Sequence, residues 1–445
     1  MKTPIFDFVK KYAESRVTRF HMPGHKGKCF LGCEKYDITE IFGADNLYSA
    51  DGIIAESEGY ASELFGTARS FYSTEGSTLA IRAMLALALA GAEKSGTRPL
   101  VLAARGAHKA FLTSAALLDF DIEWISSPRS AHIACAAVSA DEVERALSRA
   151  KNPAAVYITS PDYLGNISRV DEISAVCRKY GVPLLVDNAH GAYLAFLKPS
   201  MHPIALGADM CCDSAHKTLP VLTGGAYLHI SEKAKKYIPS ARGRLSLFAS
   251  TSPSYLILES LDLCNKHLAE GYAEGLSLAV TKVEEAKEAI KERGLSVLST
   301  EPLKIVIAPR SFGYTGEELS EYLRSREIET EFSDCEYTVL MATPENDAGD
   351  FHRLISAIDE LSQKPPLPVA LPADAGLPRA VMSVREAMLS ESEVLPTDEA
   401  VGRICAAPTV SCPPAVPIAV SGELIDGRVA ELLKKYGIKN IEIVK

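Results

Sequence analysis

A lysine that directly follows a buried apolar strand has the clearest chemical potential in this sequence. Lys217 lies in the run Ser214-Ala215-His216-Lys217, at the end of the apolar, strand-like segment 208–214. Burial disfavours a charged ammonium, so a lysine at such a place can have a lowered pKa and attack an aldehyde as a nucleophile. The structural alternative is a lysine just past the sheet whose ammonium lies in water.

Two other polar residues follow predicted strands. Asp187 stands near the end of the apolar segment 183–190, and His108 begins a helix after the predicted strand 99–103. Ligands bind at the carboxyl ends of the strands in an open α/β sheet, so both side chains are candidates for a site. Taken singly, an Asp at a strand end is more often a cap or turn residue, and a single helical histidine is usually structural.

Small hydroxyl residues and a glycine, in the run 73–78 (STEGST), stand directly before a predicted Ala- and Leu-rich helix that reaches about residue 96. Free backbone N–H groups and the helix dipole make a helix N-terminus a binding site for phosphate. Ser77 and Thr78 would add hydroxyl groups to such a site. The alternative is an ordinary helix cap, since Ser and Thr are preferred there in any case.

Together these residues form the set that pyridoxal 5′-phosphate (PLP) requires. A helix start at Ser77 and Thr78 would anchor the phosphate. Asp187 would pair with the pyridine nitrogen and keep it protonated, which makes the ring an electron sink. Lys217 would form a Schiff base with the aldehyde, and His108 would lie over the ring face.

The elements that must position these residues alternate between helix and strand from about 55 to 265. Near-continuous apolar strands separated by helices indicate a parallel sheet covered on both faces. We therefore predict an α/β fold whose large domain has a mostly parallel sheet. The strand candidates are 99–103, 155–161, 183–190, 208–214 and 225–230, and the helices between them include 141–150 and 171–180.

The rest of the chain divides by its patterns. A short amphipathic helix is predicted over 3–19, a long helical region over 254–293 that would bridge two domains, and shorter strands and helices from about 295. A proline-rich stretch at 364–378 is a linker candidate. The predicted domains are an N-terminal segment (1–54), a PLP-binding large domain (55–265), a small α+β domain (266–363), and a linker with a C-terminal domain (364–445).

Composition excludes several classes of protein. A net charge of −10 and a pI near 5.6 argue against a nucleic-acid surface. The sequence has no apolar run of ~18 residues that would predict a membrane span, and its charged N-terminus has no signal-peptide core. We expect a cytoplasmic enzyme. The ten cysteines lack paired metal-ligand spacings, so we predict reduced thiols and no metal site.

Several short runs resemble the signatures of one family, the Orn/Lys/Arg decarboxylases of the major, bacterial-type group, over nearly the whole chain. The run 187–192 (DNAHGA) resembles the family motif D-E-A-H-G-A, and 214–219 (SAHKTL) resembles S-x-H-K-x-L, whose lysine carries PLP. Further similar runs are 20–27 (FHMPGHKG), 251–255 (TSPSY), 400–404 (AVGRI) and 413–417 (PPAVP).

The resemblance implies a fold-type I PLP enzyme, similar to aspartate aminotransferase in its large domain, that decarboxylates lysine, ornithine or arginine to a diamine or polyamine product. It also implies a homodimer with active sites at the subunit interface, in a short form without an N-terminal wing domain. Catalytic roles would fall to Lys217, His216, Asp187 and His108. The residues implied in cofactor binding are Lys217, Ser77, Thr78, His108, Asp187, His190, Ser214, His216, Thr251 and Ser252, with Thr251 or Ser252 reaching the phosphate of the partner subunit.

Departures from the family pattern affect substrate fit more than chemistry. Glu75 and Asn188 stand where other members often carry different residues, and Ala415 replaces a usual Gly. The sequence does not decide which acidic residue would face the distal cation of the substrate. The candidates are Glu75, Asp45 and acidic residues of the C-terminal region.

Two other functions stay open. An aminotransferase would clamp the substrate carboxylate with an arginine, for which Arg385 is available. A catalytically silent homologue that binds a partner protein would not need Lys217, Asp187 and His108 together. The run from His21 to Lys26 could be taken for a metal site or an anion loop, but we interpret it as a structural or interface loop near the active site of the neighbouring subunit.

Overall fold

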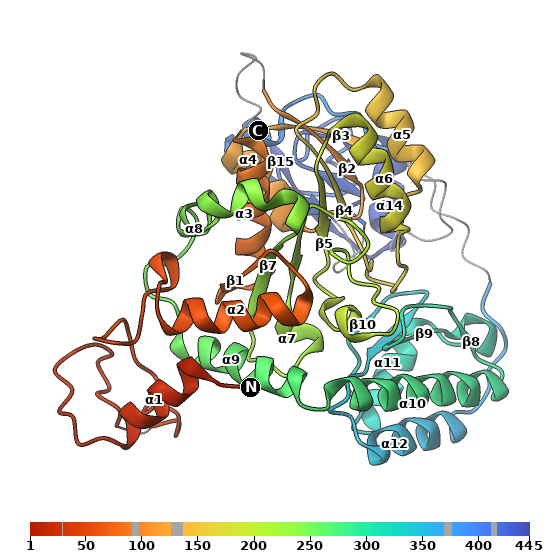
Figure 1. Cartoon of the computed structure of the whole chain (residues 1–445). Helices are drawn as coiled ribbons and strands as arrows, with labels where there is room; N and C mark the ends of the chain where they lie inside the picture. The colour runs from red at the N-terminus through yellow and green to blue at the C-terminus, as the bar shows by residue number, and fades with distance from the viewer. Residues whose placement is uncertain (29, 91–97, 126–136, 369–375, 411–415) are drawn as a thin grey trace. The chain divides into compact units, whose positions relative to one another are not determined.

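The computed structural model describes the chain except for residues 29, 91–97, 126–136, 369–375 and 411–415 (Figure 1). The chain divides into two compact units, Met1–Thr97 with Lys151–Tyr157 and Val170–Ala273, and Arg98–Ala150 with Ile158–Arg169 and Glu274–Lys445. The predicted boundaries of four segments stay a prediction. Parts of the predicted linker and of the run 413–417 lie outside the described residues.

A seven-stranded sheet has the strand order β1-β7-β6-β5-β4-β2-β3. Strands β5 and β6 pair in parallel, as do β2 and β3, whereas β7 is antiparallel to both β6 and β1. The predicted α/β fold with a mostly parallel sheet is therefore confirmed. The strands are β1 (Arg69–Ser73), β2 (Leu100–Ala104), β3 (Asp121–Ile125), β4 (Ala155–Thr159), β5 (Leu184–Asp187), β6 (Met210–Asp213) and β7 (Ala226–Ile230).

The sequence prediction does not include strands β1 and β3. The sequence of β1, RSFYS, has polar residues at three of five positions, and β3, DIEWI, carries two acidic residues. Neither has the continuous apolar run that identifies the other strands. The predicted run 183–190 also stops being a strand at Asp187, which leaves the next residues free to form a loop.

Helices of the first unit pack on one another and against the seven-stranded sheet. Helices α1, α2 and α9 pack on one another (Figure 1), and α3 packs against β6 and β7. Helix α1 ends at Glu14, five residues before its predicted end at residue 19. The helices are α1 (Pro4–Glu14), α2 (Ile53–Phe65), α3 (Gly76–Leu89), α6 (Val170–Tyr180), α7 (Ala215–Thr218), α8 (Ile238–Ser246) and α9 (Tyr255–Ala269), with short 3₁₀ turns η1 (Leu47–Ser49), η3 (Ala192–Phe196) and η4 (Glu232–Tyr237).

The long helical region predicted over 254–293 is two helices, α9 and α10 (Tyr272–Glu292). Gly271 lies between them with φ of 92°. This backbone conformation favours glycine and cannot continue a right-handed helix. The break is therefore local and comes from a single glycine.

In the second unit, a four-stranded sheet follows α10. Its order is β10-β11-β9-β8, and every neighbouring pair is antiparallel. The predicted α+β pattern after residue 295 matches these elements: β8 (Ser296–Val297), β9 (Lys304–Ala308), η5 (Pro309–Phe312), α11 (Gly316–Ser325), β10 (Phe332–Ser333), β11 (Thr338–Met341) and α12 (Ala348–Asp359).

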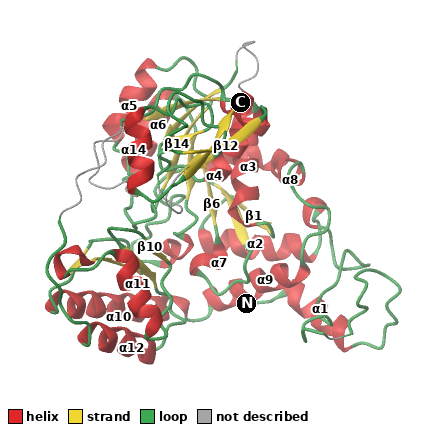
Figure 2. Ribbon diagram, turned by 180° about the vertical axis from the view of Figure 1, so that it is seen from behind, coloured by secondary structure: helices red, strands yellow, loops and turns green. Residues whose placement is uncertain are grey.

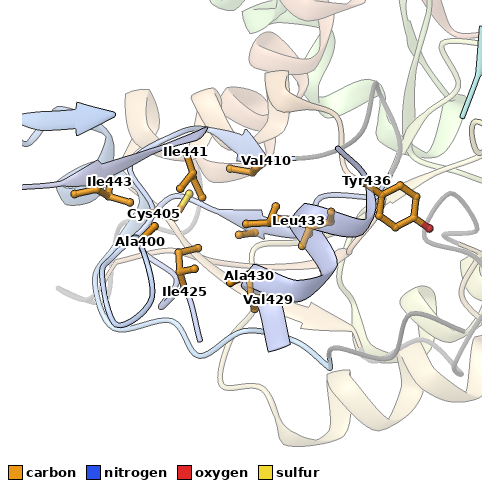
Figure 3. Packing of buried hydrophobic residues seen from close by; sticks show 12 residues of the cluster. Ala400, Cys405, Val410, Ile425, Val429, Ala430, Leu433, Tyr436, Ile441 and Ile443 are labelled. Carbon is orange, nitrogen blue, oxygen red and sulfur yellow. The ribbon is translucent and has the colours of Figure 1, made fainter. Parts of the chain in front are cut away.

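The C-terminal part of this unit has a core of its own. Helix α14 (Gly427–Lys435) places Val429, Ala430 and Leu433 against Ile441 and Ile443 of strand β15 (Figures 2 and 3). The other elements of this unit are α4 (Lys109–Leu118), α5 (Ala140–Arg149), α13 (Val384–Leu389), β12 (Ser392–Pro396), β13 (Thr409–Val410), β14 (Ala419–Val420) and β15 (Asn440–Val444).

Within the described residues, no helix has the length and apolar character that a membrane span requires. The cysteines within the same ranges are all free.

Candidate active site

Lys217 lies beside a buried histidine. Its Nζ is 3.0 Å from Nε2 of His190. His190 follows β5 and Lys217 follows β6, and these strands are parallel neighbours, so both residues come from the same edge of the sheet. Lys217 is half-buried and His190 is buried. The structure thus brings together two residues that are 27 positions apart in the sequence.

Asp187 is the last residue of β5 and is buried. Its carboxylate accepts hydrogen bonds from the Tyr157 hydroxyl (3.1 Å), the Ala189 backbone N–H (3.2 Å) and the Cys212 thiol (3.6 Å). Burial, and then the negative charge of Asp187, raise the pKa of Tyr157 well above its ordinary value, so Tyr157 stays a donor. Donors of this kind stabilise an ionised carboxylate in a buried place.

Hydroxyl groups gather at the N-terminus of α3. Ser77 and Thr78 lie in its first turn, where backbone N–H groups have no partner within the helix. The Ser214 hydroxyl donates to Ser77 Oγ at 2.9 Å, which joins the start of α7 to the start of α3. These groups can bind an anion such as phosphate.

Gly224 allows its chain segment to lie close to the residues at the start of α3. Its carbonyl accepts from the Gly76 N–H at 2.7 Å, and its φ is 102°. A Cβ at Gly224 would come within 2.9 Å of the Thr74 carbonyl oxygen. The close passage of these two chain segments therefore requires glycine.

His216 faces the loop that carries Gly224. Its Nδ1 lies 2.9 Å from the Gly225 carbonyl oxygen, so Nδ1 is the donor and Nε2 is the acceptor in the neutral ring. Burial lowers the pKa of His216, the charge of Lys217 adds to this effect, and the bond to Gly225 opposes it. The neutral form is therefore favoured.

The segment with Thr251 and Ser252 is exposed and lies near the start of α3 in the same chain. The connection is the Ser250 N–H, which donates to Glu75 Oε1 at 2.8 Å. Glu75 precedes α3 as its N-cap residue. This hydrogen bond connects Glu75, an acidic side chain at the candidate anion site, to the segment that contains residues 251–255.

His108 belongs to the other unit and is the N-cap residue of α4. Its Nδ1 accepts from the Ala110 N–H at 3.2 Å, and its side chain is exposed. The predicted position of His108 over the cofactor ring stays a prediction.

A buried polar network that the sequence prediction missed includes Asn188, the residue after Asp187, and Asp213, the residue before Ser214. Asn188 Nδ2 donates to Asp213 Oδ1 at 2.7 Å. The other oxygen of Asp213 lies 3.0 Å from His202 Nε2 and 3.3 Å from His229 Nε2. All four side chains are at most 1% exposed. Asp213 and His229 interrupt apolar strand runs, which is the signal that the sequence offered.

The same network includes the group of side chains within the described ranges that can converge on a metal ion, namely His202, Cys211 and Asp213. Hydrogen bonds from His202 Nε2 to Asp213 at 3.0 Å and to Cys211 Sγ at 3.9 Å account for the proximity of these atoms. Elsewhere, His25 pairs with Asp37 at 3.2 Å, and His21 with the Tyr12 hydroxyl at 2.6 Å.

Two candidate substrate-binding side chains have other partners. Asp45 accepts from the backbone N–H groups of Asn46, Gly52 and Ile54 at 2.8–2.9 Å, so it caps the start of α2. Arg385 on α13 donates to the Ala116 carbonyl at 2.6 Å. These contacts favour structural roles for both.

The donor set fits PLP. A primary amine, a buried carboxylate that accepts several hydrogen bonds, and hydroxyl groups at a helix N-terminus correspond to the aldehyde, the pyridine nitrogen and the phosphate of the cofactor. Asp187 and Lys217 supply the carboxylate and the amine from the ends of the neighbouring strands β5 and β6, and Ser77 and Ser214 supply hydroxyl groups from the starts of α3 and α7.

Comparison with known proteins identifies the class. Residues 3–300 match the family model described as the Orn/Lys/Arg decarboxylase major domain. Arginine decarboxylases of Halalkalibacterium halodurans and Bacillus subtilis are 28% and 29% identical to this chain, each over 95% of it and 91% of the relative. The constitutive lysine decarboxylase of E. coli has the same fold, with a TM-score of 0.81 and 17% identity over 100% of this chain and 82% of that one.

The fold is that of the fold-type I enzymes. Together with the family match, the donor set defines a PLP-dependent enzyme. The chain belongs to the Orn/Lys/Arg decarboxylase family. It is a carboxy-lyase that acts on a basic amino acid with PLP as its cofactor.

Proposed function

We propose that this protein decarboxylates arginine at a PLP site built around Lys217. The observation that carries the site is the 3.0 Å contact between Lys217 Nζ and His190 Nε2 at the strand ends that also present Asp187. The relatives named arginine decarboxylase support arginine over lysine and ornithine. The product would be a polyamine precursor, and the expected location is the cytoplasm.

Each residue has a separate task in this proposal. Lys217 binds the cofactor through its amine, and His190 orients that amine. Asp187 holds a proton on the ring nitrogen. When bound, PLP supplies an electron sink for the bond that breaks at the substrate α-carbon. Ser77, Thr78 and Ser214 hold the phosphate, and His108 covers the ring.

We assign the protonation of the substrate α-carbon to Lys217 rather than to His216. Burial lowers the pKa of His216, so little of it carries a transferable proton near neutral pH. The neutral His216 can instead accept a hydrogen bond through Nε2. Its proposed role is to position the cofactor beside Lys217.

The proposed assembly is a homodimer. Thr251 and Ser252 are exposed in the single chain. Residues that contact a partner subunit are expected to be exposed when that subunit is absent. In the dimer their hydroxyl groups would bind the phosphate in the site of the partner subunit. The loop with His21 and His25 would lie near the same site.

Borohydride reduction of the holoenzyme tests the attachment residue. The reduction should fix PLP to Lys217, as peptide mass shows, and Lys217→Ala should lose the visible absorbance and the turnover together. Lys217→Arg keeps the charge and serves as a control that cannot bind the aldehyde in the same way. Retention of absorbance and turnover in Lys217→Ala would refute the assignment.

A competition assay tests the substrate. An equal mixture of arginine, lysine and ornithine with PLP should yield CO₂ and mainly the amine from arginine. A preference for lysine or ornithine would change the substrate but leave the class intact. Keto-acid formation without CO₂ would instead favour the aminotransferase alternative.

A further inference from the structure

The candidate site has a second layer formed by two neighbouring side chains. Asn188 is the residue after Asp187, and Asp213 is the residue before Ser214. Their side chains meet through the 2.7 Å hydrogen bond from Asn188 Nδ2 to Asp213 Oδ1. The bond therefore joins the two short segments that present Asp187 and Lys217.

This side-chain bond continues the backbone ladder between β5 and β6. The last paired residues are Asp187 and Cys212, and the Asn188 N–H donates to the Cys212 carbonyl at 3.0 Å. After Asp187 the backbone of β5 leaves the sheet, whereas Asp213 of β6 is still paired with Tyr227 of β7. The hydrogen bond between the Asn188 and Asp213 side chains then holds the loop that follows β5 against the end of β6.

Two histidines hold Asp213 from the other side. The Ile204 N–H donates to His202 Nδ1 at 3.4 Å, so in the neutral ring Nε2 carries the proton that His202 donates to Asp213. His229 lies 3.3 Å from the same oxygen. The contacts with His202 and His229 lower the pKa of the Asp213 carboxyl despite its burial, so the group stays ionised. An ionised Asp213 needs a donor at position 188.

The sequence at position 188 fits this requirement. The family motif D-E-A-H-G-A has a glutamate where this chain has Asn188. A glutamate there would place a second carboxylate beside Asp213 in a fully buried location, and like charges in such a place are strongly disfavoured. The amide of Asn188 and the acid of Asp213 are therefore matched to each other.

We propose that Asn188 and Asp213 are a positioning pair that sets the separation between the carboxylate of Asp187 and the amine of Lys217. The proposal rests on the proposed PLP site. Neither residue contacts the cofactor in this scheme. They act through the residues next to them in the chain, and the pair is specific in charge: one amide and one carboxylate.

A reciprocal exchange tests the pair. The variants are Asn188→Asp, Asp213→Asn and the double exchange, each compared with the wild-type holoenzyme. Each single variant should bind PLP about tenfold or more weakly and change the visible circular dichroism of the bound cofactor, since buried partners are mismatched. The double exchange restores one amide and one carboxylate, and the amide oxygen introduced at position 213 could still accept from His202. It should recover PLP affinity to within about threefold of wild type.

Asn265→Ala is the matched control. Asn265 is a fully buried amide of α9 that donates to Tyr72 Oη at 2.7 Å and to the Ser57 carbonyl at 3.0 Å. Its loss should lower thermal stability without a change in cofactor dichroism or PLP affinity. A positioning role is distinguished in this way from a general loss of stability.

The outcomes separate the two proposals. PLP that is not trapped at Lys217 in the wild type would overturn the proposed function. PLP trapped at Lys217, with wild-type affinity and dichroism in both single variants, would overturn the positioning pair alone. If Asn188→Asp does not fold, Asp213→Asn and the double variant decide. A double variant that binds PLP no better than Asp213→Asn refutes the pair.

Discussion

The buried Asp187 carboxylate is surrounded by a small number of hydrogen-bond donors. A buried polar group is costly unless it has such partners. Tyr157, Ala189 and Cys212 each donate to it, so the ionised form has partners on both oxygens. An ionised Asp187 is what the proposed contact with the pyridine nitrogen requires.

Replacement of Asp187 by Asn removes the charge and keeps the shape. The ring nitrogen then loses the partner that holds its proton, so turnover should fall by about 10²–10³-fold, the range seen when one preorganised electrostatic partner is removed. The absorbance of the bound cofactor should also change. Steady-state kinetics and absorbance spectra of the purified variant measure both effects.

Tyr157→Phe is the companion variant. It removes one donor to Asp187 but keeps the carboxylate, so its loss of turnover should be much smaller than that of Asp187→Asn. Near-normal turnover in Asp187→Asn would contradict the role of Asp187 as the ring partner.

Local signals explain which site residues could be predicted from the sequence. Lys217, Asp187 and Ser77 each stand at the end of a strand or the start of a helix, and these places can be recognised within a window of a few residues. The partner of Asn188 is 25 positions away, and its identity depends on the pairing of β5 with β6. No local pattern specifies that contact.

At the scale of single elements, helix α9 carries a buried glutamate, Glu259, whose charged form is disfavoured by burial. Glu259 is 5% exposed, and its Oε1 has no hydrogen-bond partner among the described residues. Burial, together with the negative charges of Asp37 and Asp262, raises the pKa of Glu259 to about 8. The folded protein therefore binds a proton here that the unfolded chain releases at lower pH.

Stability should consequently fall as pH rises from the ordinary pKa of a glutamate to about 8. Glu259→Gln removes this dependence. The variant should match the wild type near pH ~5 and be more stable by on the order of 1–3 kcal/mol near pH ~8.5. Thermal unfolding across this range measures the difference. Glu285→Gln, at an exposed position on α10, should leave the pH profile of the wild type unchanged.

An unfolding temperature of Glu259→Gln that falls with pH as steeply as that of the wild type would show that Glu259 is not the group responsible. Asp262, whose pKa is raised to about 6 mainly by burial, would then be the next group to replace.

Element boundaries are harder to predict than element types. The pattern over 254–293 correctly predicts helix, but the turn at Gly271 divides it, since a glycine in a helical pattern does not by itself reveal a left-handed conformation. β1 has mostly polar residues and is specified by its antiparallel partner β7 rather than by its own sequence. Tertiary pairing decides such cases.

At the scale of the whole molecule, buried ion pairs hold distant parts of a unit together. Arg105, which follows β2, donates to both carboxylate oxygens of Glu423 at 2.6 Å and 2.8 Å. It also donates to the Pro417 carbonyl at 3.1 Å. The C-terminal part of the second unit is thus bound to the loop between β2 and His108, the N-cap residue of α4.

The proposed homodimer leads to a prediction about mixed subunits. In the proposed dimer, each site takes Lys217 from one protomer and Thr251 with Ser252 from the partner. Lys217→Ala therefore removes the first contribution to each site, and the Thr251→Ala/Ser252→Ala double variant removes the second. Unfolding and refolding the two inactive variants together should yield mixed dimers with one intact site. About half of the dimers should be mixed, so activity should return to about a quarter of the wild-type value.

Each variant refolded by itself is the control and should stay inactive. Light scattering should show a dimer in every preparation. If the mixture of dimers stays inactive, both groups of residues act within one chain, and the contact of Ser250 with Glu75 at the start of α3 would then place Thr251 and Ser252 at the phosphate of their own subunit. Complementation therefore decides which chain completes the phosphate site, because only a shared site can be restored by mixing.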